Sequence, residues 1–219
     1  RLIGVGGDAN HLDGGRNEIY FNDGTGAPFT NNDTRLLSSS YAPTRAIKTV
    51  DIDLDGDLDI VAGQRDDSRV YWFENTGNPE QPDWPKHYLG VNDWPDLFLV
   101  GDVDGDERLD IVYAYKDAFG WAQNPADPTT TWQTFTIWSG TRRTGGALAD
   151  IDLDGDLDVL YGNAWFQNPL PTGDPTRSSQ WTMRDIDASW TTEARGAVGD
   201  LNGDGRPDVV LSGEEDMSG

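Results

Sequence analysis

The segment Asp150–Asp158 reads DIDLDGDLD, and three other stretches of the chain repeat its pattern. They are Asp51–Asp59 (DIDLDGDLD), Asp102–Asp110 (DVDGDERLD) and Asp200–Asp208 (DLNGDGRPD). These four windows hold 18 of the 39 carboxylate residues, and they start at residues 51, 102, 150 and 200. A steady period near 50 residues indicates an array of one supersecondary unit.

Each unit reads as four short strands around its acidic loop. A small apolar run precedes the loop, as in Leu97–Val100, and a β-branched run follows it, as in Ile111–Tyr113. An aromatic strand comes next, as in Val70–Phe73, and the last strand starts at a second Trp and alternates, as in Trp132–Trp138. No window carries an apolar stripe of helical period over three turns. Short strands broken by Gly, Pro and Asp therefore predict an all-β fold.

Further residues recur at fixed places in the units. A Trp stands three residues before an Asn at Trp72 and Asn75, at Trp121 and Asn124, and at Trp165 and Asn168, and the second Trp follows at Trp84, Trp132 and Trp181. This phasing divides residues 1–219 into a partial unit at 1–44, three complete units at 45–93, 94–142 and 143–192, and a partial unit at 193–219. The chain then starts in mid-unit, because Leu2–Gly6 matches the strand after an acidic loop. The alternative is a degenerate first loop formed by Asp8, Asn10 and Asp13.

Five carboxylates within nine residues repel one another unless a cation neutralises them. Calcium accepts six to eight oxygen ligands in irregular geometry, and Gly at loop position 6 permits the positive φ that turns the chain back. We expect side-chain oxygens from positions 1, 3, 5 and 9 and the backbone carbonyl of position 7. The predicted ligands of three to four calcium ions are Asp51, Asp53, Asp55, Asp57 and Asp59; Asp102, Asp104, Asp106, Arg108 and Asp110; Asp150, Asp152, Asp154, Asp156 and Asp158; and Asp200, Asn202, Asp204, Arg206 and Asp208.

Three other interpretations of these loops agree less well with the sequence. An EF-hand needs a Glu at position 12, but that position holds Ala62, Tyr113, Tyr161 and Leu211. Magnesium demands near-octahedral geometry and keeps its waters, so calcium is favoured. A solvated acidic turn explains one copy but not four copies in register.

The copies also differ from one another. Asn202 replaces Asp at position 3 of the fourth loop, and Glu107 stands where Gly is expected in the second, so a left-handed Glu would weaken the second site.

The overall charge excludes several partners. Lys and Arg total 16, Asp and Glu total 39, and the net charge is −23, which predicts neither nucleic-acid binding nor membrane insertion. The chain contains no Cys, so disulfides, zinc–thiolate sites and cysteine nucleophiles are excluded. The start at Arg1 gives the expectation of a processed or excised chain.

No catalytic residues are predicted. His11 and His87 are the only histidines, and His87 is expected to pack or lie at the surface. The loops on the rim opposite the calcium loops collect basic and aromatic residues, which suit a glycan with a carboxylate or sulfate group. The candidate ligand-binding residues are Arg45, Trp94, Arg142, Arg143 and Trp190. The alternative is that these Trp wedge between repeats and these Arg pair with nearby Asp.

The acidic loops resemble the FG-GAP/VCBS repeat family, whose D-x-[DN]-x-D-G-x-x-D pattern is met in the loops that start at Asp51, Asp150 and Asp200. The turn Asn22–Phe29 (NDGTGAPF) is similar to one common in VCBS repeats. The resemblance implies a β-propeller with one four-stranded blade per repeat, as part of a larger propeller of about seven blades, with calcium on one rim. The rival is closure of this chain on itself with four or five blades.

The same resemblance implies a function. It points to an extracellular or cell-surface module that binds or adheres to a glycan or a protein, together with the remaining blades or partner domains. The alternative is the propeller part of a secreted carbohydrate-active enzyme of the polysaccharide lyase or sugar dehydratase type.

Overall fold

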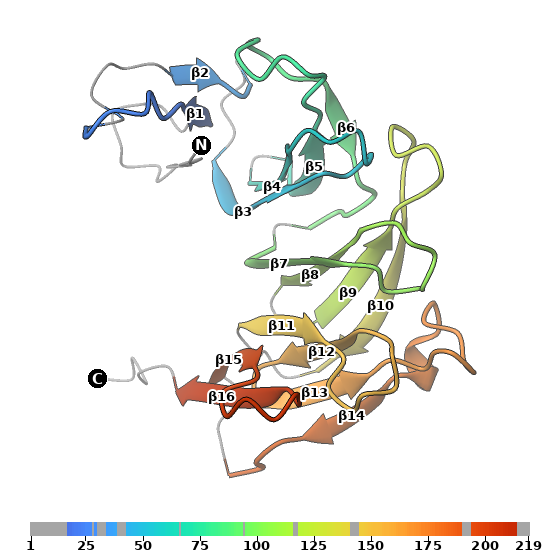
Figure 1. The fold of residues 1–219 in the computed structure, drawn as a ribbon. Coiled ribbons are helices and arrows are strands. Elements are labelled where there is room, and N and C mark those ends of the chain that lie inside the picture. The colour runs from blue at the N-terminus through green and yellow to red at the C-terminus, as the bar shows by residue number, and fades with distance from the viewer. Residues whose placement is uncertain are drawn as a thin grey trace, which may run out of the picture. The chain divides into compact units, whose positions relative to one another are not determined.

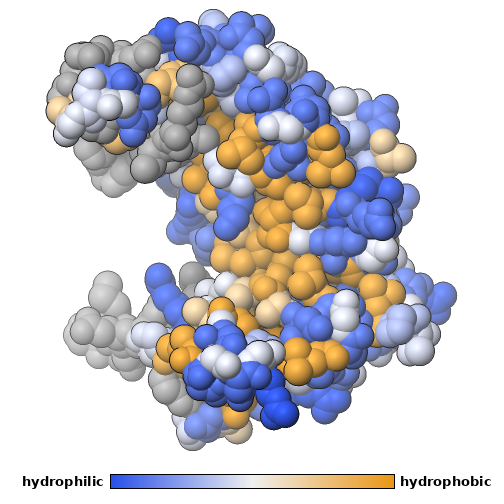
Figure 2. All heavy atoms as spheres, in the orientation of Figure 1, coloured by the Kyte–Doolittle hydropathy of each residue, from blue (hydrophilic) through white to orange (hydrophobic). Residues whose placement is uncertain are grey.

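A computed structural model describes residues 17–27, 29, 34–38, 43–65, 67–93, 95–115, 118–140, 145–189 and 194–213 (Figure 1). The chain divides into two compact units, one of Arg1–Asp96 with Asp127–Trp132 and the other of Leu97–Ala126 with Gln133–Gly219. On the face drawn in Figure 2, hydrophilic residues surround a broad hydrophobic area. No helix in the described ranges is long and apolar enough to span a bilayer.

The first unit contains one complete four-stranded sheet and one small sheet. The complete sheet has the order β3 (Thr44–Val50), β4 (Asp59–Gln64), β5 (Arg69–Phe73) and β6 (Lys86–Tyr88), with every neighbouring pair antiparallel. The small sheet pairs β1 (Glu18–Tyr20) with β2 (Thr34–Leu36). Their core is formed by Ile19, Phe21, Leu37, Ile60, Ala62, Tyr71, Phe73 and Trp84.

The second unit contains two complete four-stranded sheets and a pair of strands. The first sheet has the order β7 (Leu97–Gly101), β8 (Asp110–Tyr115), β9 (Ala118–Gln123) and β10 (Gln133–Ser139). The second has the order β11 (Gly146–Ala149), β12 (Asp158–Tyr161), β13 (Ala164–Gln167) and β14 (Thr182–Asp185), and β15 (Ala194–Gly199) pairs with β16 (Asp208–Gly213). Phe119 packs edge-on against Phe166 at 4.7 Å, which joins the two complete sheets in one core.

The prediction of an all-β fold is confirmed. Among the described residues the only helical segment is the single 3₁₀ turn η1 (Ser178–Gln180). Each complete sheet keeps its four strands in sequence order, which is the up-and-down order of a propeller blade. The acidic loops connect β3 to β4, β7 to β8, β11 to β12 and β15 to β16, between the first two strands of each blade as expected.

The last strand of each blade starts slightly later than the sequence indicates. It begins one or two residues after the second Trp, at Lys86, Gln133 and Thr182. The second Trp is instead buried. Among the described residues, its indole N–H is unpartnered in Trp84 but is anchored in the two following repeats. Trp132 donates to the carbonyl of Pro128 at 3.0 Å, and Trp181 donates to that of Pro175 at 2.9 Å.

Candidate metal centre

A buried Asp at position 9 anchors each of the first three loops. Asp158 is the first residue of β12 and is inaccessible to solvent. One of its carboxylate oxygens accepts the backbone N–H of Ile151 at 3.0 Å, and the other accepts that of Asn168 at 2.9 Å. Asp59 and Asp110 make the same two bonds in their own repeats. The Asn that recurs after the aromatic strand is therefore the second anchor of the loop.

The side chain of this Asn completes the connection. Asn75, Asn124 and Asn168 each donate from Nδ2 to the carbonyl of loop position 8, at 3.1–3.3 Å. Asn168 donates in addition to the carbonyl of Val103 at 2.9 Å, and Val103 belongs to the acidic loop of the preceding sheet. The repeated Asn thus holds the loop closed and, in the second unit, joins it to its neighbour.

The Asp at position 1 orders the turn itself. In all four loops its carboxylate accepts the backbone N–H of position 6. The donors are Gly56 at 3.1 Å, Glu107 at 2.8 Å, Gly155 at 3.0 Å and Gly205 at 2.8 Å. These bonds fold the chain around the carboxylate, so that the side chains of the loop can converge on one point.

Two positions of each loop have positive φ. Position 6 is Gly in three loops, and Glu107 adopts φ 70° in the remaining one, as the sequence predicts. Position 4 is also left-handed, with Leu54 at φ 61° and Leu153 at φ 65°, where the other loops carry Gly105 and Gly203. Three loops therefore carry one non-glycine residue in a left-handed conformation, at a cost of about 1–2 kcal/mol each. Because the first and third loops carry the same kind of strain, the left-handed Glu107 does not distinguish the second loop from them.

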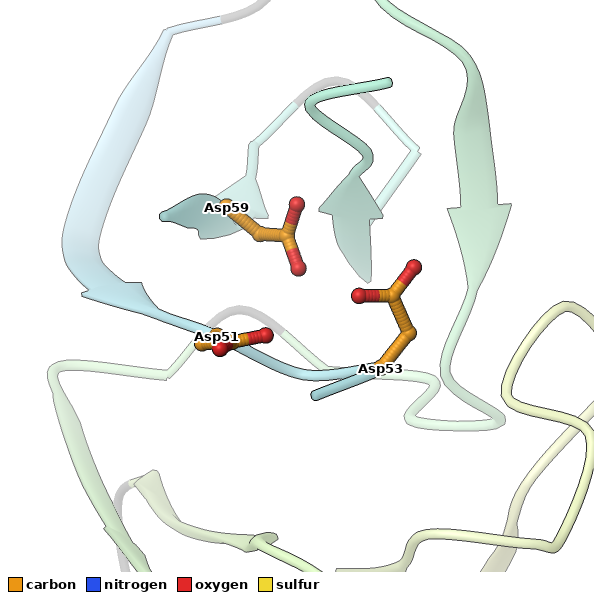
Figure 3. A group of neighbouring side chains, drawn as sticks. All are labelled: Asp51, Asp53 and Asp59. Atoms are coloured by element: carbon orange, nitrogen blue, oxygen red, sulfur yellow. The ribbon is translucent and has the colours of Figure 1, made fainter. Parts of the chain in front are cut away.

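Three carboxylates converge in each of the first three loops. Figure 3 shows Asp51 from the end of β3, Asp53 from the loop and Asp59 from the start of β4 around a common space. Their candidate ligand oxygens all lie within 4.8 Å of one another, and the same holds for Asp102, Asp104 and Asp110 and for Asp150, Asp152 and Asp158. One oxygen of Asp51 and one of Asp104 are buried without a hydrogen-bond donor. Oxygen atoms that are orphaned in this way fit a bound cation.

The electrostatics of the triads favour a cation as well. Burial raises the pKa of Asp59 to about 6, of Asp110 to about 7 and of Asp158 to about 6, although their backbone hydrogen bonds act in the opposite direction. Burial also raises the pKa of Asp152, and the nearby charges of Asp154 and Asp150 add to the effect. The ionised loop is therefore under strain in the absence of a positive charge.

Position 5 makes one hydrogen bond that is common to all four loops, but the other contacts of positions 5 and 7 differ between loops. The Asp at position 5 lies outside the triads and accepts the backbone N–H of position 7 in every loop, as at Asp55, Asp106, Asp154 and Asp204. In the second loop the Arg108 guanidinium pairs with Asp106, which withdraws one carboxylate from a cation. In the third loop both oxygens of Asp156 are buried without a donor, and burial and the neighbouring carboxylates raise its pKa to about 7. The Asp156 side chain therefore belongs to the acidic cluster, beyond the carbonyl contribution that we expected.

The residue immediately before the repeated Asn also contributes to the loop, although it was not predicted. Gln167 donates from Nε2 to Asp152 at 2.5 Å, and Gln123 makes the equivalent bond to Asp104. Glu74 occupies this place in the first repeat. Burial raises the pKa of Asp53, and the charge of Glu74 adds to the effect. The signal was present as Glu-Asn or Gln-Asn after each aromatic strand. It could not be interpreted before the partner in the loop was known.

The fourth loop keeps the frame but not the triad. Asp208 accepts the N–H of Leu201 at 2.9 Å, and Asp200 accepts three loop N–H groups, which lower its pKa. Position 3 is Asn202, so across the described residues only the first three loops form a triad of carboxylates. The fourth loop would supply one charge less to a cation.

The candidate ligand-binding residues are only partly covered by the structure. Arg45 is exposed at 47% of its side chain and pairs with Asp96 at 2.5 Å. This contact matches the alternative in which such Arg residues pair with nearby Asp. Trp94, Arg142, Arg143 and Trp190 lie outside the described residues, so their role stays a prediction.

Comparison with known proteins agrees with this geometry. A comparison with curated proteins gives no match. The FG-GAP-like repeat matches twice, over residues 51–113 and 102–161, and each match starts at position 1 of an acidic loop. Together the two matches cover residues 51–161, which is just over half of the 219 residues. The chain therefore belongs to the FG-GAP-like repeat family.

Proposed function

We propose that this protein is a calcium-binding propeller module that carries three to four calcium ions in its acidic loops. The observation that supports it most is the triad at loop positions 1, 3 and 9, which recurs in three repeats with orphaned buried oxygens in two of them. A ligand set made only of oxygen atoms suits a hard cation, and the irregular loop suits calcium better than magnesium.

Each site would use the residues that the loop brings together. In the first loop Asp51, Asp53 and Asp59 would supply the triad, and Asp55 and the backbone carbonyl of Asp57 would add further oxygen ligands. The bound ion neutralises the repulsion within the triad and fixes the loop between the first two strands of the blade. Calcium binding then stabilises the fold, because the site does not exist in the unfolded chain.

The wider role that we propose is binding or adhesion outside the cell, with a glycan or a protein as partner and with further blades or domains alongside. FG-GAP-like repeats and loops suited to weak calcium sites support this role, since extracellular calcium is abundant enough to fill weak sites. The blades provide a rigid frame, and the loops of the calcium-free rim provide the variable contacts.

Calcium binding is tested by isothermal titration of protein that has been treated with EDTA, together with thermal melting. We expect three to four equivalents of calcium to bind and the melting temperature to rise. Magnesium at the same concentration should give a smaller rise. A melting temperature that is identical with EDTA and with calcium would contradict the proposal.

A further inference from the structure

One face of the sheet β3–β6 carries a polar group that the acidic loops do not use. It consists of Gln64 at the end of β4, Arg69 and Tyr71 on β5, and Lys86 and Tyr88 on β6, and we call it the Lys86 cluster. Strand register places these residues together, because Gln64 is opposite Arg69 and Tyr71 is opposite Tyr88. Alternation along the strands puts all five on one face.

The contacts inside the cluster are close. The Lys86 ammonium lies 3.6 Å from the centre of the Tyr71 ring and donates to Oε1 of Gln64 at 2.7 Å. The Arg69 guanidinium lies 5.1 Å from the centre of the Tyr88 ring. Each cation is thus held against an aromatic face, which fixes its position.

Two buried polar groups in the cluster have no acceptor. Gln64 is only 2% exposed, and its Nε2 amide has no hydrogen-bond partner. The Tyr88 hydroxyl oxygen is buried and unpartnered as well. A buried donor without an acceptor is costly, so two such donors on one face indicate a missing acceptor-rich group.

The charges around the cluster also favour a group that accepts hydrogen bonds. Within the described ranges neither Lys86 nor Arg69 has a carboxylate at ion-pairing distance, in a chain with 39 acidic residues. Among the described residues, the carboxylate that contacts the group is Asp67, which accepts the Tyr71 hydroxyl. Burial lowers the pKa of Lys86, while the nearby Asp67 charge acts to raise it. In the part of the chain that the structure describes, two cations therefore face one anion.

We propose that the Lys86 cluster binds an oxyanion, the carboxylate or sulfate group of an acidic saccharide. Gln64 Nε2, the Tyr88 hydroxyl and the Lys86 ammonium would donate to its oxygens, and Arg69 would close the site from the exposed side. Charge-assisted bonds of this kind are short and strong. We assign the oxyanion to a saccharide because the proposed function includes glycan binding.

This inference deepens the binding part of the proposed function and rests on it, but it does not depend on calcium. The cluster uses no residue of an acidic loop. Loss of calcium binding with anion binding retained would therefore overturn only the calcium sites, and the reverse result would overturn only the Lys86 cluster.

The test is titration of the whole protein, with calcium present, by sodium glucuronate, sodium sulfate and glucose. We expect glucuronate or sulfate to bind and the neutral glucose not to bind. The stronger of the two anions identifies the natural group as a carboxylate or a sulfate. Equal binding of glucose and glucuronate would overturn the proposal, and so would the absence of binding by both anions.

Variants assign the binding to the cluster. Lys86→Met should weaken anion binding by about tenfold or more, since it removes one charge-assisted bond. Lys48→Met is the matched control, because Lys48 is an exposed lysine on β3 outside the cluster. Arg69→Gln changes an exposed side chain and keeps the test valid if Lys86→Met does not fold. Equal anion affinities of wild type, Lys86→Met and Arg69→Gln would overturn the assignment.

Discussion

Substitution of Asp152 by Asn should change the stability of the protein in opposite directions with and without calcium. Asp152 is exposed, and one of its carboxylate oxygens lies within 4.8 Å of one carboxylate oxygen of Asp150 and one of Asp158. Two unit charges at this distance repel by about 1 kcal/mol in a water-like medium and by about 3 kcal/mol at an effective dielectric constant of 20. Because Asp152 is solvent-exposed, we take the lower value for each partner. Asp152→Asn should then stabilise the calcium-free protein by about 2 kcal/mol.

The same substitution should weaken the calcium-bound form, because it removes a ligand charge from the third site. The assay is urea unfolding followed by tryptophan fluorescence, once in EGTA and once in excess calcium, with isothermal titration to count the bound ions. Asp185→Asn is the control, since it removes one charge from β14, outside the loops. If Asp152→Asn lowered the free energy of unfolding equally in both conditions, the triad would be a structural element and not a metal site.

Three further outcomes are expected. The pKa values of the position 9 carboxyls are raised from 3.8 to between about 6 and about 7, so the folded state binds protons more tightly than the unfolded chain. The stability of the calcium-free protein should therefore fall as the pH rises through that window, and melting in EGTA that improved with pH would contradict this. Asn168→Ala removes three side-chain hydrogen bonds, whereas Asn75→Ala removes one. In urea unfolding, Asn168→Ala should therefore lower the free energy of unfolding by about 2 kcal/mol more than Asn75→Ala does. Equal losses would refute the joining role of Asn168. Arg108→Ala frees the Asp106 carboxylate and should tighten calcium binding at the second loop in a titration, whereas weaker binding would show that Arg108 supports the site.

The sequence carried most of the local information about the sites. The turn of alternating Asp with Gly at position 6 is specified within nine residues, because the carboxylates at positions 1 and 5 accept N–H groups only a few positions away. The positions 1, 3 and 9 of the triads, the β-strands on either side and the left-handed Glu107 were all predicted on this basis. Local hydrogen bonding and the alternation of strand residues are the physical reasons for this success.

The left-handed Leu54 and Leu153 show where local reasoning stopped short. Leucine has no preference for positive φ, so nothing in its identity announced a second turn at position 4. The comparison of loops contains the hint, because Gly105 and Gly203 stand at the same position. The loop as a whole imposes the conformation, and the bonds to the position 1 Asp hold it.

Only the tertiary structure decided which distant residues complete the sites. Asn75 reaches Asp59 from 16 residues away, Gln167 reaches Asp152 from 15 residues away, and Asn168 reaches Val103 from 65 residues away. The Lys86 cluster likewise needs the register of β4, β5 and β6 before Gln64 and Lys86 meet. The sequence specifies a repeat and its loops through short-range forces. The pairing of strands and the packing of sheets then decide which side chains close each site, because those contacts depend on the whole blade and not on any one segment.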